Sequence, residues 1–199
     1  MTWPRDMNRR RVARAEIGLW HRTQPGRGLQ RRFTSEQEMQ DAVRHFVEIA
    51  YSSRLFAGPF LKLGAVRLQP RIRRGVCGLC RVDLSPLGQA ELLFAADDSG
   101  MSLITVTHEV AHYLDFASYR NKDLLRRVAA HNPHWASTHI VLLSLLYRQL
   151  SLDLLNEYRQ HRVVLDELLL LRAGIAPKDN EAHRQAGKQR NAASSSPAG

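Results

Sequence analysis

Cysteine is scarce in this chain, and its two cysteines, Cys77 and Cys80, lie close together. A small secreted protein that depends on disulfides usually carries more, so we expect a protein of the reducing cytoplasm. The spacing Cys-X-X-Cys also matches half of a structural zinc ribbon, but a closed site of that kind needs a second pair, which this chain lacks. We favour ordinary thiols in a hairpin over a zinc ion shared between two chains.

Long apolar runs are also missing. The longest, over residues 163–176, is interrupted by Asp166, Glu167 and Arg172, so it is too short and too charged to cross a bilayer. The first residues carry positive charge with no apolar stretch behind it, which does not fit a signal peptide. The sequence therefore predicts no membrane partner.

Acidic residues are outnumbered by basic ones, 19 against 29, which gives a formal net charge of +10. Such an excess favours polyanionic partners, above all the phosphates of nucleic acids. Much of it lies in residues 1–33, where nine arginines are opposed only by Asp6 and Glu16. We expect this segment to be a poorly ordered basic arm, and two interpretations stay open: a solvated basic tail, or an arm that binds nucleic acid through phosphates without sequence preference. We also expect it to be dispensable for metal binding, because the metal ligands proposed below all lie beyond residue 107.

Three segments predict the first elements of a folded domain. Ser35, with Glu38 three positions later, is typical of a helix N-terminus, and the apolar spacing that follows predicts a helix over residues 36–53. Residues 62–74 alternate apolar and basic positions, which is typical of a strand. Residues 91–96 are almost entirely apolar and predict a buried strand.

Three further helices are predicted in the second half of the chain. Residues 97–100 end the second strand and cap the first of these helices, Pro133 begins the next, and the last covers residues 152–172. The elements together indicate a compact α+β fold, a small sheet with supporting helices, over residues 34–172. We expect the polar segment 173–199 to be a disordered tail and the protein to be a monomer.

The first of these helices carries the sequence Thr-His-Glu-Val-Ala-His at residues 107–112. His108 and His112 are four positions apart, so they lie on one helix face and can bind the same metal ion. Catalytic zinc sites use three protein ligands and leave the fourth position to water. Glu109 would face that position and take a proton from the water. We favour such a site over an unrelated pair of surface histidines.

The third ligand must come from another part of the chain, and the candidates are Asp115, His131, His134 and His139. Asp115 lies one turn beyond His112, which favours a role in orienting a ligand. His131 precedes an Asn-Pro helix start, where a loop can turn a side chain back over the motif helix. His134 and His139 lie within that next helix. We therefore favour His131, followed by His134.

The residue that would stabilise a developing oxyanion is not indicated by the sequence. A tyrosine hydroxyl is a common donor in that role. The candidates are Tyr113, Tyr119, Tyr147 and Tyr158. Spacing does not choose between them, and each is more typical of a core or boundary aromatic residue.

The motif helix and the sequence His-Asn-Pro-His-Trp, which follows after eighteen residues, resemble the SprT-like metallopeptidases. They resemble more closely a group of small metallohydrolases from actinobacteria and their phages. In that group, HExxH is followed by a motif close to His-Gly-Pro-Glu-Phe, whose histidine is the third ligand. His131, Pro133 and Trp135 match that motif, whereas Asn132 and His134 replace its glycine and glutamate.

The resemblance covers residues 34–150 and implies a zincin-like domain with an active-site helix. It also implies that the edge of a strand beside the site receives the substrate. Residues 91–96 are our candidate for that strand.

Two functions are compatible with these features. The first is a zinc-dependent metallohydrolase, in the simplest case a peptidase acting on proteins or peptides. His108, His112 and His131 would bind Zn²⁺, and Glu109 would activate water. The second is a nucleic-acid-associated protein, in which residues 1–33 supply the activity and the zincin-like domain is a scaffold. The intact Glu109 favours the enzyme, because a scaffold has no need of it.

Overall fold

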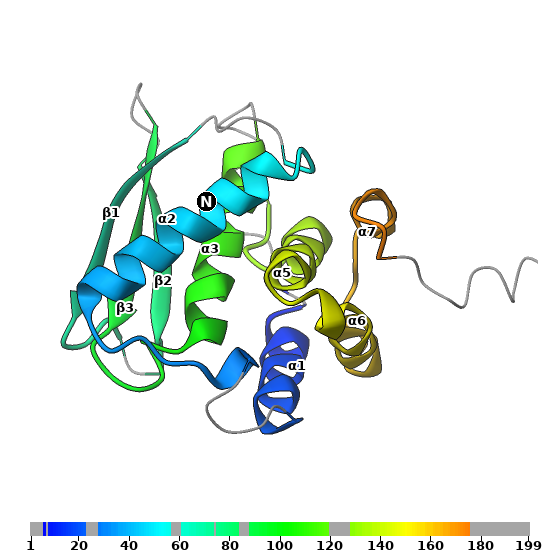
Figure 1. Cartoon of the computed structure of the whole chain (residues 1–199), viewed down its shortest axis with the longest axis horizontal. Coiled ribbons are helices and arrows are strands. Elements are labelled where there is room, and N and C mark those ends of the chain that lie inside the picture. Colours follow the sequence, from blue (N-terminus) through cyan, green and yellow to red (C-terminus); the bar gives the residue numbers. More distant parts are fainter. Residues whose placement is uncertain are drawn as a thin grey trace, which may run out of the picture.

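The computed structural model of the 199-residue chain describes residue 6 and residues 8–22, 28–56, 61–73, 75–83, 88–119 and 128–175. Within them, one small sheet is combined with helices, so the fold is α+β as expected (Figure 1). The predicted tail over residues 173–199 lies outside the described residues from position 176 onward. None of the helices in the described ranges has the length and apolar character that a membrane crossing needs.

The sheet has three strands within the described ranges, β1 (Lys62–Gln69), β2 (Gly78–Asp83) and β3 (Gln89–Ala95), in the order β1-β3-β2. The central strand β3 runs parallel to β1 and antiparallel to β2. Because its backbone is hydrogen-bonded on both sides, β3 has no free edge. Our choice of residues 91–96 as the strand that receives a substrate is therefore wrong. In the part of the chain described, β1 and β2 are the edges of the sheet.

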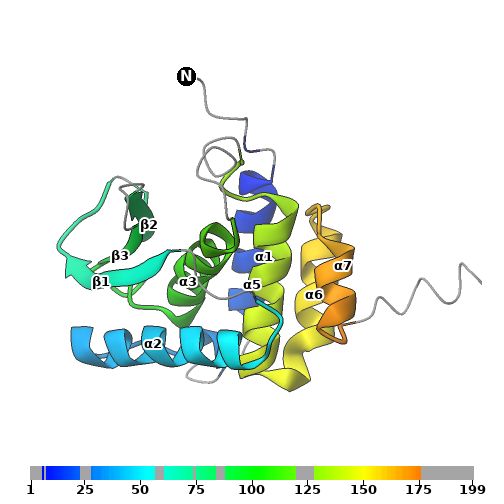
Figure 2. The same ribbon diagram turned by 90° about the horizontal axis from the view of Figure 1, so that it is seen from above.

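Two helices, α2 (Glu36–Ser52) and α3 (Leu103–Ser118), pack against the sheet (Figure 2). The start of α2 confirms the prediction, because the Ser35 hydroxyl accepts a hydrogen bond from the N–H of Glu38 at 3.1 Å. The Glu38 carboxylate in turn accepts a hydrogen bond from the backbone N–H of Thr34 at 2.8 Å. In a capping box the donor would be the N–H of Ser35, one residue later. The apolar spacing that predicted this helix places four residues in the core: Met39, Val43, Phe46 and Ala50.

The motif helix α3 is buried along most of its length, because it lies between the sheet and α5 (Pro133–Leu146). Its N-cap is Ser102, whose hydroxyl accepts the N–H of Thr105 at 3.3 Å. The predicted cap at residues 97–100 is therefore wrong. That segment forms a separate turn, in which the carboxylate of Asp97 accepts backbone N–H groups of the residues that follow it.

The next helix, α5, begins where the sequence predicted. Asn132 is its N-cap, and the side-chain oxygen of Asn132 accepts the N–H of Trp135 at 3.0 Å. Pro133 is the first helical residue, where its missing N–H costs no hydrogen bond. The helix is buried from Trp135 to Ser144, which makes it the centre of the helical half of the molecule.

The last predicted helix, over residues 152–172, is two helices. After the short turn η2 (Arg148–Leu150), α6 spans Ser151–Gln160 and α7 spans Glu167–Arg172. Arg162 has a φ of 56°, in the left-handed region that ends helices. The sequence contained a sign of this break, because the Asp166 carboxylate caps the N–H groups at the start of α7.

The described part of the basic N-terminal segment is mainly helical, which corrects our prediction of a poorly ordered arm there. Residues Arg9–Arg22 form α1, and the turn η1 (Gly28–Gln30) follows. Helix α1 packs against α6 through a buried apolar stripe: Val12, Ala15 and Leu19. Figure 2 shows α1 grouped with α5, α6 and α7 on the side of α3 away from the sheet. The folded unit therefore begins well before residue 34.

Candidate metal centre

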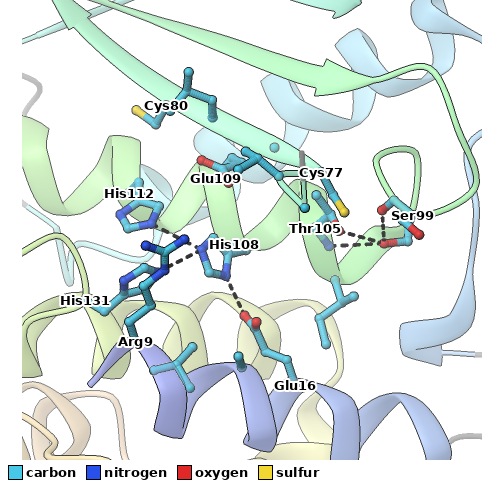
Figure 3. Close-up of a pocket in the computed structure, with 18 of the residues that line it drawn as sticks. Arg9, Glu16, Cys77, Cys80, Ser99, Thr105, His108, Glu109, His112 and His131 are labelled. Carbon is cyan, nitrogen blue, oxygen red and sulfur yellow. Dashed lines mark hydrogen bonds and ion pairs between the residues drawn. The ribbon is translucent and has the colours of Figure 1, made fainter. Parts of the chain in front are cut away.

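Three imidazole rings meet beside α3 (Figure 3). His108 and His112 come from successive turns of α3, and His131 comes from the loop before α5. The Nε2 atom of His108 lies 3.2 Å from Nε2 of His112 and 3.2 Å from Nε2 of His131. Two nitrogen ligands of a tetrahedral zinc ion are about 3.3 Å apart, given a Zn–N distance of about 2.0–2.1 Å. The three nitrogens are thus spaced to hold one metal ion.

Two carboxylates hold two of these rings from behind. The Nδ1 atom of His108 lies 2.5 Å from Oε1 of Glu16, and Nδ1 of His131 lies 2.5 Å from Oδ2 of Asp6. A carboxylate at Nδ1 keeps the proton on that nitrogen and leaves the Nε2 lone pair for a metal ion. Asp6 and Glu16 are the two acidic residues of the arginine-rich segment. The N-terminal segment is therefore part of the site.

The third ring, His112, is held by aromatic packing. It stacks between Trp135, at a centroid distance of 4.8 Å, and Phe116, at 5.7 Å. Its Nδ1 atom has no hydrogen-bond partner among the described residues. Its orientation therefore depends on the two rings and on its position four residues after His108.

The electrostatics of the rings make a proton and a metal ion competitors for the same nitrogen of His108. Burial acts to lower the pKa of His108, but the charge and the hydrogen bond of Glu16 outweigh it and raise that pKa to about 9. Burial, with the neighbouring histidines, lowers the pKa of His112 well below its usual value. Without a metal ion, His108 is therefore protonated on both ring nitrogens at neutral pH, and His112 is neutral. A metal ion would replace the proton on Nε2 of His108, because it binds at the same nitrogen.

Glu109 lies beside the histidines and against strand β2. Burial raises its pKa to about 7, although the charge of His108 and the backbone N–H of Cys80 act in the opposite direction. Gly78 makes room for it, because a Cβ atom at that position would lie 2.6 Å from Cγ of Glu109. A carboxyl group with a pKa near 7 can both accept and return a proton at neutral pH.

The site opens into a cleft of about 740 Å³. Helix α1 forms one side of the cleft and residues 75–80, which lead into β2, form the other; α3 forms its floor. His108, His112 and Glu109 lie on this floor, and His131 lines the cleft from the loop before α5. An edge strand, a buried carboxyl group and three nitrogens that could hold a metal ion thus share one opening.

The other sequence candidates for a third ligand lie elsewhere. The Nδ1 atom of His134 is 2.6 Å from Oδ1 of Asp115, whose second oxygen accepts the side-chain N–H of Asn132 at 2.8 Å. Asp115 thus contacts the helix cap that follows His131, and the described residues show no contact between Asp115 and any of the three proposed ligands. Neither Asp115 nor His134 belongs to a group of described residues that could hold a metal ion.

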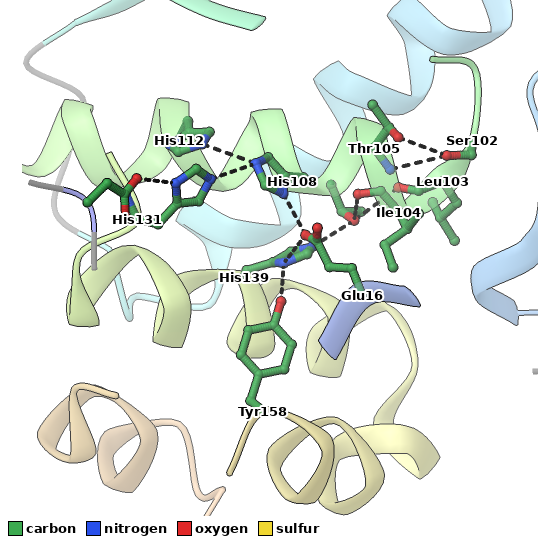
Figure 4. A network of polar contacts seen from close by, with 12 residues as sticks. Glu16, Ser102, Leu103, Ile104, Thr105, His108, His112, His131, His139 and Tyr158 are labelled. Atoms are coloured by element: carbon green, nitrogen blue, oxygen red, sulfur yellow. Dashed lines mark hydrogen bonds and ion pairs between the residues drawn. The ribbon is translucent and has the colours of Figure 1, made fainter. Parts of the chain in front are cut away.

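His139 is fully buried and belongs to the same polar network as the three rings, because its Nδ1 atom lies 3.6 Å from Oε1 of Glu16, which also contacts His108 (Figure 4). The Nδ1 atom of His139 also lies 2.7 Å from the Tyr158 hydroxyl, and its Nε2 atom lies 3.1 Å from the Thr107 hydroxyl. Burial lowers its pKa to about 3. Glu16, His108 and His139 are also close enough to hold an ion, but both ring nitrogens of His139 contact hydroxyl groups outside that group, those of Tyr158 and Thr107.

The two cysteines and the four candidate tyrosines can also be placed. Cys77 precedes β2 and Cys80 lies within it, and both line the cleft as free thiols. Burial raises the pKa of each thiol, so neither is an activated nucleophile. None of the four tyrosines is among the described residues that line the cleft. Tyr113, for example, is buried and donates to the Leu61 carbonyl at 3.1 Å.

No protein-family model, curated protein or solved structure matches this chain. The resemblance described above therefore rests on its motif residues alone.

Replacing Glu16 by Gln should weaken zinc binding by about 10- to 100-fold, because Nδ1 of His108 loses its carboxylate partner. Competition with a chromophoric zinc chelator measures this affinity. Glu48→Gln, on the exposed side of α2, is the matched control and should bind like wild type. Equal affinities for Glu16→Gln and wild type would show that α1 does not orient a ligand.

Proposed function

We propose that this protein is a zinc-dependent hydrolase with a zincin-like active site, and that it acts on peptide bonds. The proposal is supported by the position of three Nε2 atoms: that of His108 lies 3.2 Å from that of His112 and 3.2 Å from that of His131. The buried Glu109 lies next to them in the same cleft. His108, His112 and His131 would hold the ion and leave a fourth position to water. A bound zinc ion makes that water more acidic and polarises a carbonyl group.

Glu109 would act as the general base and then as the general acid. Its carboxylate takes a proton from the attacking water and returns it to the nitrogen of the leaving amine. Burial raises the pKa of this carboxyl group and so favours protonation, whereas the charge of a bound zinc ion would favour the carboxylate that accepts the proton. Gly78 and the N–H of Cys80 would keep the carboxylate in position, since one makes room for it and the other donates a hydrogen bond to it.

A peptide substrate is favoured by the strand that borders the site. Residues 78–80 of β2 line the cleft, and β2 is an edge of the sheet in the described residues. An extended peptide can pair with such an edge as an additional strand, through main-chain hydrogen bonds. That pairing would bring a peptide bond close to Glu109, which touches the same strand. The other edge, β1, does not line the cleft.

The proposal is tested by Glu109→Gln, which removes the base and leaves the three histidines in place. We expect full zinc content and a loss of hydrolysis of at least about 100-fold. Substrates can be found by comparing new peptide termini in cells that produce wild type or the variant, and purified proteins can then be assayed on them. His108→Ala is the control that should lose zinc as well as activity. Cleavage by Glu109→Gln at the wild-type rate would contradict the proposed role.

Nucleic-acid binding is a second candidate, favoured by the exposed arginines of α1. Arg10 and Arg14 face solvent on a helix that borders the cleft, so a bound polyanion would lie next to the site. Removal of residues 1–33 cannot test this separately. The proposed ligands do lie beyond residue 107, but Asp6 and Glu16 contact His131 and His108, so the deletion would also remove the carboxylate partners of two ligands.

The test is therefore a double substitution of Arg10 and Arg14 by Gln, which leaves both carboxylates in place. If α1 binds duplex DNA through phosphates, the variant should bind more weakly. Its plot of log affinity against log salt concentration should be less steep, by about 0.9 for each phosphate that the variant no longer neutralises. Mobility shifts at several salt concentrations measure both effects. Unchanged affinity and slope would exclude these arginines as the DNA-binding surface.

A further inference from the structure

We propose that Arg9 is a catalytic residue, which binds the negatively charged oxygen that develops on the substrate carbonyl. The inference rests on the proposed function, because it assigns the oxyanion donor of the same site. Hydrolysis of an amide places negative charge on that oxygen as water adds to the carbon. The four tyrosines that the sequence offered for this role are absent from the described lining of the cleft, so a side chain that acts beside the metal ion would be a different residue.

Arg9 is fixed beside the histidines by a shared carboxylate. Its backbone N–H donates to Oδ1 of Asp6 at 3.0 Å, and Oδ2 of the same carboxylate lies 2.5 Å from Nδ1 of His131. The carboxylate of Asp6 thus connects the main chain of Arg9 to His131, a proposed metal ligand. Figure 3 shows the Arg9 side chain extending from α1 into the cleft on the side of the three imidazole rings.

The guanidinium of Arg9 is available for an anion. The side chain is exposed, and it makes no ion pair with a carboxylate in the described part of the chain. Other arginines nearby are engaged: Arg32, which also lines the cleft, pairs with Asp98, and Arg11 donates to the Arg162 carbonyl at 3.0 Å. A guanidinium offers several N–H donors in a planar fork, which suits an oxyanion.

The charges of the site require a cation of this kind. Asp6, Glu16 and an ionised Glu109 carry three negative charges, whereas a zinc ion supplies two positive ones. The loaded site without Arg9 would therefore carry one net negative charge, and it would keep that charge as Glu109 takes the proton of the water and the substrate oxygen becomes negative. The positive charge of Arg9 restores neutrality before the reaction. It would lie where the substrate oxygen becomes charged, in a cleft where water screens it only in part.

A second arginine on the other side of the cleft is an alternative donor to the oxyanion. Arg73 is also exposed and lines the opening from the segment before β2. No contact among the described residues joins it to the histidines or to their carboxylates, whereas Arg9 shares Asp6 with His131. We therefore assign the role to Arg9 and include Arg73 in the test.

The experiment uses the full-length protein loaded with cobalt(II), whose visible absorption changes when a ligand binds at the open position. Methylphosphonate is the probe, because it is a small tetrahedral anion. Imidazole is the uncharged comparison, because it needs the metal ion but no cation beside it. Both are titrated into wild type, Arg9→Gln, Arg10→Gln and Arg73→Gln, after cobalt content has been measured. Arg10→Gln is the matched control, since it removes the neighbouring charge on the solvent side of α1.

We expect Arg9→Gln to bind methylphosphonate about 10- to 100-fold more weakly than wild type, with unchanged imidazole affinity. Arg10→Gln and Arg73→Gln should bind both probes like wild type. The assignment is overturned if Arg9→Gln binds methylphosphonate as tightly as wild type, if Arg73→Gln is the weakened variant, or if cobalt-loaded wild type binds imidazole but not methylphosphonate.

Failure of the proposed metal site gives a different result, because wild type would then take up no cobalt, and failure of the proposed hydrolysis is seen separately in the comparison of wild type with Glu109→Gln. If Arg9→Gln alone fails to load, Arg9→Lys replaces it. That variant keeps the charge but loses the planar fork, so it should bind methylphosphonate several-fold more weakly than wild type. Equal binding by Arg9→Lys would contradict a role for the guanidinium.

Discussion

The contact between a carboxylate and Nδ1 of an imidazole determines how the rest of this molecule is organised. Glu16 makes it with His108 and Asp6 makes it with His131. Both carboxylates are largely withdrawn from water, and charges in such surroundings require a nearby opposite charge. The chain provides it through the histidines, which can carry a proton or bind a metal ion. The N-terminal helix, the motif helix and the loop before α5 therefore meet at one charge-balanced point.

This arrangement gives α1 three roles in the proposed enzyme. Its buried stripe fixes it against α6, its acidic residue orients His108, and its side facing the motif helix forms part of the cleft. Strand β2 faces it across the opening and positions Glu109 through Gly78 and Cys80. The metal-binding nitrogens, the base and a substrate-pairing edge are thus supplied by elements that pack on α3 or belong to it. A change in the docking of α1 should therefore affect metal affinity as well as stability.

The sequence predicted those features that depend on local chemistry. Ser35 and Asn132 cap the expected helices, because capping needs only residues within one turn. His108 and His112 share a helix face for the same reason. His131 was favoured from a loop that precedes a helix start, and it lies with the other two rings. The sequence alone did not exclude His134 as the third ligand. In the structure, His134 contacts Asp115, whereas His131 lies beside His108 on α3.

What the sequence did not reveal depends on contacts between distant residues. Asp6 and His131 are 125 positions apart, and Glu16 and His108 are 92 apart, so no local pattern links them. The arginines of the N-terminal segment concealed the spacing of Val12, Ala15 and Leu19, which makes α1 a packed helix. The strand order β1-β3-β2 depends on which strands pair, and no local pattern determines that. The apolar character of residues 91–96 predicts a strand that is buried on both faces. It does not predict that both edges of the strand are hydrogen-bonded to neighbouring strands.

The central claim is that three histidines bind one zinc ion in the cleft. X-ray absorption at the zinc edge of the zinc-loaded, full-length protein tests it most directly, because the method reports the identity and distance of the ligand atoms. Our account predicts nitrogen and oxygen neighbours only, at about 2.0–2.1 Å, with the outer scattering of three imidazole rings. A sulfur neighbour at about 2.3 Å would contradict it, since zinc would then be bound by Cys77 or Cys80.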